Sequence, residues 1–189
     1  MFAKALSFSV ILIFVFSCVA LAQISVSNLV PEKYQVGTIA VDEKYYVDRD
    51  YTVVALPDEL DGVTMIMTGN DDKNATGEGF MSFDIGVPAT VYIAHDSRGE
   101  SDKGGVPPAW LEDEFTFMDG VAIEASDANM GTFGIWKKDF NAGTVKLGGN
   151  ADPPAAGQGS MYLVLLNPLD LSSVKSIGKA TTTWAEIKK

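Results

Sequence analysis

Residues Gly79–Arg98 read GFMSFDIGVPATVYIAHDSR, and this stretch decides the fold class that the sequence predicts. Apolar and polar residues alternate over 81–85, which is the period of a strand with one buried face. Gly and Pro at 86–88 favour a turn, and the apolar, β-branched run 89–94 is typical of a second strand. The stretch therefore predicts a β-hairpin over residues 80–94.

Polar clusters flank this predicted hairpin. His95 to Arg98 follow its second strand, and Asn70 to Asn74 precede its first strand. If the hairpin forms, both clusters lie at the same end of a sheet. Functional residues would then lie on loops, and the strands would supply the stability.

The rest of the chain reads as short strands separated by Gly and Pro. We expect further strands at 34–40, 45–50, 51–56, 63–68, 115–118, 121–125, 132–140, 144–147 and 161–166. A single helical turn is expected at 58–61, and the breaker-rich segment 97–109 predicts a long loop that ends beside Trp110. The fold class predicted is all-β, an antiparallel jelly-roll-like β-sandwich with a short C-terminal helical tail.

Three regions follow from the composition along the chain. Residues 1–22 have a charged start, an apolar run and a terminal Ala-x-Ala, which predicts a signal peptide cut before Gln23 and a secreted, extracellular or periplasmic protein. A retained membrane anchor and lipidation at Cys18 are the alternatives. The β-sandwich domain is predicted at 23–168. Residues 169–189 are predicted to be a linker and a short helix, which docks on the chain's own sandwich or on a partner.

The composition excludes several classes of function. The chain is acidic, with a formal net charge of −11, and has no basic stripe to neutralise phosphates, so no nucleic-acid partner is expected. Its one cysteine lies in the predicted signal peptide, and it has one histidine. A mature chain would therefore hold no disulfide, no Cys-ligated metal and no His-pair metal site. After cleavage no membrane span is expected.

The segment 70–78 is rich in side-chain oxygens, which hard cations prefer. Asn70, Asp72 and Asn74 are the candidate ligands of a structural calcium ion. Such side chains also cap turns without a metal, so the alternative is a turn with no cofactor.

Five residues are candidates for binding a sugar. Carboxylates and a guanidinium form charge-assisted hydrogen bonds with hydroxyls, and an indole ring stacks on the C–H face of a sugar. The set is Asp71, Asp72, Asp96, Arg98 and Trp110. The alternative for Asp96 and Arg98 is an ion pair that braces a loop. Trp136 lies inside a predicted strand and is expected to be structural.

Several segments together resemble a known module. They are YYVDRDYT (45–52), NDDK (70–73), TVYIAHDSR (90–98), PAWL (108–111), KDF (138–140) and LGGN (147–150). The pattern, over about residues 34–167, is similar to the galactose-binding-like, carbohydrate-binding β-sandwiches of secreted bacterial proteins. The resemblance implies glycan binding. Such a module is often accompanied by a catalytic domain, and from this sequence we expect it to stand alone.

The sequence thus predicts a secreted, non-catalytic module that binds a polysaccharide or a cell-surface glycan. His95 and Asp96 are adjacent in a strand and point to opposite faces, so they make no catalytic dyad, and no G-x-S-x-G motif is present. One alternative is a structural or adhesive surface protein that self-associates through its C-terminal tail. A small hydrolase is the other.

Overall fold

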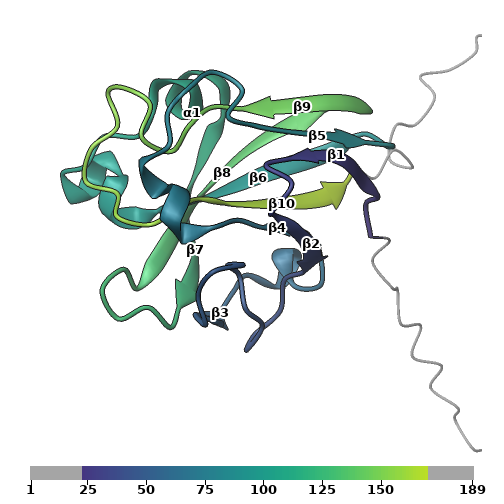
Figure 1. Ribbon diagram of the computed structural model, residues 1–189. Coiled ribbons are helices and arrows are strands. Elements are labelled where there is room, and N and C mark those ends of the chain that lie inside the picture. The colour runs from purple at the N-terminus through teal and green to yellow at the C-terminus, as the bar shows by residue number, and fades with distance from the viewer. Residues whose placement is uncertain (1–22, 170–189) are drawn as a thin grey trace, which may run out of the picture.

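Two antiparallel sheets form a β-sandwich in the computed structural model, which describes residues 23–169 (Figure 1). The small sheet has the order β1-β5-β9, and the large sheet has the order β2-β4-β10-β6-β8-β7-β3. Every pair of named strands runs antiparallel. The predicted all-β antiparallel sandwich is confirmed.

The strands are short and the helices shorter. The small sheet contains β1 (Val26–Val30), β5 (Met81–Ile85) and β9 (Gly143–Leu147). The large sheet contains β2 (Gln35–Thr38), β3 (Val53–Ala55), β4 (Thr64–Met67), β6 (Ala89–Asp96), β7 (Thr116–Ala125), β8 (Thr132–Phe140) and β10 (Leu163–Pro168). One α-helix, α1 (Ala109–Glu114), and the 3-10 turns η1 (Asp58–Leu60), η2 (Asn70–Asn74), η3 (Ser97–Gly99) and η4 (Ser101–Lys103) lie between strands of the described chain.

The predicted hairpin over residues 80–94 is wrong, because its two strands belong to different sheets. β5 pairs with β1 and β9, whereas β6 pairs with β10 and β8. β5 buries one face only, but β6 is buried on both faces for most of its length. A strand of that kind belongs in the middle of a covered sheet. The turn at 86–88 therefore carries the chain from one layer to the other.

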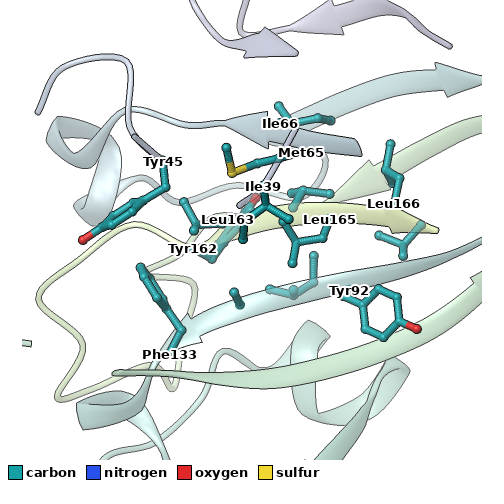
Figure 2. Close-up of a cluster of buried hydrophobic side chains, with 14 of the residues drawn as sticks. Ile39, Tyr45, Met65, Ile66, Tyr92, Phe133, Tyr162, Leu163, Leu165 and Leu166 are labelled. Atoms are coloured by element: carbon teal, nitrogen blue, oxygen red, sulfur yellow. The ribbon is translucent and has the colours of Figure 1, made fainter. Parts of the chain in front are cut away.

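The core lies on both faces of the central strand β10. Leu163 and Leu165 share one face with Met65, since side chains alternate along each strand. On that face Tyr45 packs edge-on against Phe133, with ring centroids 5.4 Å apart (Figure 2). The small sheet lies over the other face (Figure 1). β10 and β6 are thus anchored on both sides.

Other local predictions were wrong for identifiable reasons. The strand predicted at 45–50 is absent, because this segment pairs only through the isolated parallel bridge between Tyr46 and Thr68. β1 was not predicted, because its register shifts between Ser27 and Val30 and this shift hides the alternation.

Other predicted elements differ in extent or in type. The strands expected at 115–118 and 121–125 form one irregular strand, β7. Trp110 lies on α1 rather than in a loop. The predicted single turn at 58–61 corresponds to η1. The predicted signal peptide, and the predicted tail from residue 170 onward, lie outside the described residues.

Candidate functional site

Three loops meet at one end of the sandwich. β4 and β6 both pair antiparallel with β10, so they run in the same direction and end at the same edge. The loop 68–80 follows β4, the loop 97–108 follows β6, and the loop 148–162 leads into β10. The two polar clusters therefore do lie at one end, as predicted. The central strand β10 brings them together, not a hairpin.

Buried asparagine side chains hold the first and third of these loops together. The side-chain amide of Asn150 donates to the carbonyl of Lys73 at 2.8 Å. The side-chain oxygen of Asn70 accepts the N–H of Met161 at 3.1 Å. Both asparagines are buried, so these bonds are shielded from competing water. The loop end is consequently a fixed surface.

Asp96 is buried at the end of β6 and is bonded on both oxygens. Its carboxylate accepts from the Arg98 guanidinium at 2.6–3.2 Å and from the backbone N–H of Arg98 and of Gly159. Burial by itself raises the pKa of Asp96, but the Arg98 side chain and these N–H groups outweigh it and hold the pKa below its usual value. Asp96 is fully buried, whereas the Arg98 side chain is 37% exposed. In this arrangement the pair braces the loops.

His95 points to the opposite face of β6 and belongs to a second buried network. Its Nδ1 lies 2.9 Å from Oε1 of Glu100, and the same oxygen accepts the indole N–H of Trp136 at 3.0 Å. All three side chains are buried. Trp136 therefore lies in the interior, where the sequence placed it. Sequence reasoning missed Glu100, because nothing in the loop 97–108 marks one acid as buried.

The acidic residues of η2 are engaged with basic side chains from other segments. Asp72 accepts from Lys33 at 2.8 Å and from the Tyr34 hydroxyl at 2.7 Å. Asp71 pairs with Arg49, and the hydrogen bond from Arg49 lowers the pKa of Asp71. Both carboxylates therefore lie at the loop end, and neither lines the cavity beside Trp110.

The proposed calcium ligands do not form a closed cage. Asn70 is buried and its side-chain oxygen is bonded to the backbone, Asp72 pairs with Lys33, and Asn74 is exposed. Among residues 23–169, no three His, Cys, Asp or Glu side chains gather closely enough to hold a metal ion.

Trp110 lines an open groove of about 610 Å³ at the same end of the sandwich. We call this cavity the Trp110 groove. Its lining residues are Glu78, Gly79, Ser82, Trp110, Glu114, Lys146, Leu147, Gly148 and Asp152. They come from the loop 68–80, from β5, α1 and β9, and from the loop 148–162.

The indole of Trp110 is held in one orientation. Its N–H donates to the carbonyl of Gly149 at 3.0 Å, and its ring packs edge-on against Phe115 and Tyr162. The ring also lies directly on Gly148, where an added Cβ would be 2.3 Å from the indole Cδ1. Only glycine leaves room for the ring at that position. The ring is half-buried, so part of it remains available to a ligand.

Polar groups surround the indole in the groove. Ser82 and Lys146 are direct partners across β5 and β9, and both point away from the buried pair Met81 and Leu147. Asp152 is a structural member of the wall, since its oxygens accept the backbone N–H groups of two glycines, at 2.6 and 2.8 Å.

Two other acids complete the lining of the groove. Glu114 pairs with Lys138 at 2.6 Å. Glu78, like Lys146, takes part in no ion pair within the described chain. These two side chains are free to bind a ligand.

Of the five predicted sugar-binding residues, only Trp110 lines this groove. Asp71 and Asp72 face Arg49 and Lys33, and Asp96 and Arg98 face each other. The sequence reasoning missed the polar lining residues of the groove. They lie far apart in the chain and carry no motif, so only the sheet register and the loop contacts bring them together.

The comparisons with known proteins concern the fold. No protein-family model matches the chain, and no curated protein matches it. Among solved structures, a beta-glucuronidase from glycoside hydrolase family 2 matches with a TM-score of 0.61 and 21% identity, over 72% of this chain and 13% of that chain. A GH138 enzyme targeting pectin rhamnogalacturonan II matches with a TM-score of 0.46 and 13% identity, over 80% of this chain and 17% of that chain.

The first likeness shows that this β-sandwich has the fold of one part of a glycoside hydrolase. The match covers 13% of the first neighbour's chain and 17% of the second's, so this chain spans less than a fifth of either neighbour's length. Within residues 23–169, no helix is long and apolar enough to cross a membrane.

Proposed function

We propose that this protein is a secreted, non-catalytic module that binds a glycan in the Trp110 groove. The observation that carries the proposal is the half-buried Trp110 ring, which is held by Gly149 and sits beside the unpaired polar side chains of Glu78 and Lys146. A glycoside hydrolase contains a part with the same fold, which supports a carbohydrate-related role.

The chemistry of the groove suits a sugar. The apolar indole packs against the C–H face of a pyranose, and the carboxylates and the ammonium hydrogen-bond to its hydroxyls. A rigid aromatic side chain loses little conformational entropy on binding, and Trp110 is already oriented by its contacts. Asp96 and Arg98 contribute indirectly by holding the loops that form the end of the sandwich.

The test is the binding of the purified protein to a panel of soluble polysaccharides, with and without calcium. Trp110→Ala is expected to weaken binding about tenfold or more, as removal of a central aromatic contact does elsewhere. Phe117→Ala is the matched control, since it removes another partly exposed aromatic ring that does not line the groove. Binding that survives Trp110→Ala unchanged would contradict the proposed site.

A second variant separates binding from stability. Lys146→Ala combined with Glu78→Ala removes exposed side chains that form no ion pair, so we expect weaker binding with an unchanged unfolding midpoint. Release of reducing sugar from any bound polysaccharide would contradict the non-catalytic role. Absence of binding to the whole panel would favour the self-associating structural protein.

A further inference from the structure

We propose that the Trp110 groove selects uncharged glycans over glycans that contain uronic acids. This inference rests on the proposed function and names the substrate class of the same groove. It is carried by the charges of the side chains that line the cavity.

Carboxylates outnumber cations in the groove. Glu78, Glu114 and Asp152 line it, and Lys146 is its one basic lining residue within the described chain. Lys138 pairs with Glu114 at 2.6 Å but does not line the groove, and its ammonium lies over the Phe115 and Phe140 rings. Since Lys138 offsets Glu114, the carboxylates without a cationic partner are Glu78 and Asp152, and a ligand meets an excess of negative charge over Lys146.

A uronic acid would bring one further negative charge for each sugar residue. Like charges placed side by side oppose binding, and they reject the wrong partner more strongly than they favour the right one. A neutral sugar incurs no such repulsion, and the same carboxylates accept hydrogen bonds from its hydroxyls. The chain's net charge of −11 acts in the same direction.

Lys146 does not reverse this preference. It is exposed at the outward face of β9, so its ammonium is strongly hydrated and screened by salt. Asp152 cannot turn away from the groove, because its two oxygens are bonded to Gly77 and Gly149. One negative charge of the lining, that of Asp152, is therefore fixed in position, whereas the positive charge of Lys146 is not.

The experiment compares pairs of glycans with the same backbone, in which one member is neutral at C6 and the other carries a carboxylate there. The probes are β-glucan against its C6-oxidised uronate form, and methyl-esterified homogalacturonan against the de-esterified polymer. The neutral member of a pair is expected to bind about tenfold more tightly at low ionic strength. Raising the salt from about 20 mM to about 500 mM should strengthen uronate binding and leave neutral binding unchanged.

A charge variant tests the cause of the preference. The double variant Glu78→Gln, Glu114→Gln is expected to reduce the ratio of neutral to uronate affinity by a factor of about three. It removes two negative charges from the lining and leaves Lys138 without its partner Glu114. Glu112→Gln is the matched control. It removes an exposed carboxylate from α1, the helix that carries Glu114, and Glu112 does not line the groove.

The outcomes separate the two proposals. Equal or tighter binding of the uronate, or uronate binding that weakens with salt, would overturn the charge selection and leave the glycan-binding module standing. Failure of every probe to bind, neutral or charged, would overturn both.

Discussion

The end of β6 and the Trp110 groove lie at the same end of the sandwich but use their polar groups in opposite ways. At the end of β6, Asp96 is fully buried and both of its oxygens accept hydrogen bonds within the protein. In the groove, Glu78 and Lys146 are exposed and pair with nothing in the described chain. The difference predicts that changes at the first site cost stability and changes at the second cost binding.

This comparison also explains how the groove is built. Asp96 bonds to Gly159 and Arg98 bonds to Ser160, both in the loop 148–162. The same loop supplies Gly148 and Asp152 to the groove. The buried polar site therefore holds the wall of the open one, because an unmade buried hydrogen bond is costly.

The largest effect is expected from Asp96→Ala. The substitution leaves the Arg98 guanidinium and the N–H of Gly159 without their acceptor, so the free energy of unfolding should fall by about 3 kcal/mol. Urea unfolding followed by tryptophan fluorescence measures it. Asp102→Ala is the control, since that carboxylate is exposed. Equal stability of the two variants would contradict the stabilising role assigned to Asp96.

The contribution of Asp96 should depend on pH in a defined direction. The pKa of Asp96 is lowered in the folded protein, so its stabilisation is complete above the unfolded value of about 3.9. It is lost as the pH falls through the folded pKa. The difference in unfolding free energy between wild type and Asp96→Ala should therefore be constant near neutral pH and shrink as the pH falls below about 3.9. A difference that grows on acidification would contradict the assigned ion pair.

A smaller loss of stability is expected from Gly148→Ala. The added methyl would lie 2.3 Å from the Trp110 ring, so the ring or the loop must move. Overpacking of this kind costs about 1–3 kcal/mol, and displacement of the ring should also abolish glycan binding. Calorimetric unfolding and a binding assay measure the two effects. Gly86→Ala is the control, because its added Cβ meets no atom within 4 Å.

The smallest effect is expected from Asp71→Ala. Asp71 pairs with Arg49 on the surface, and its side chain is 70% exposed. Exposed ion pairs contribute little because water and salt screen them, so we expect no measurable change in unfolding. Unchanged glycan binding would place the binding site in the groove alone. Lost binding would extend the site to η2.

The comparison also shows which parts of the fold the sequence could predict. Most strands were predicted close to their observed limits, because an alternating pattern such as that of Met81, Phe83 and Ile85 is a local property. The strand at 26–30 was not predicted, because its register shifts between Ser27 and Val30, and the strand predicted at 45–50 is absent, because that segment pairs only through an isolated bridge. The pairing of β5 was also wrong, since pairing is set by burial in three dimensions.

The sequence by itself determined the all-β class and the position of the two polar clusters at one end of the sheet, and both follow from residue type and local period. Only the tertiary structure decided that Asp96 is buried against Arg98 and that Glu78, Lys146 and Asp152 surround the indole. The reason is physical. Whether a polar side chain braces the fold or faces a ligand depends on burial and on partners far away in the chain, and neither is encoded in its neighbours.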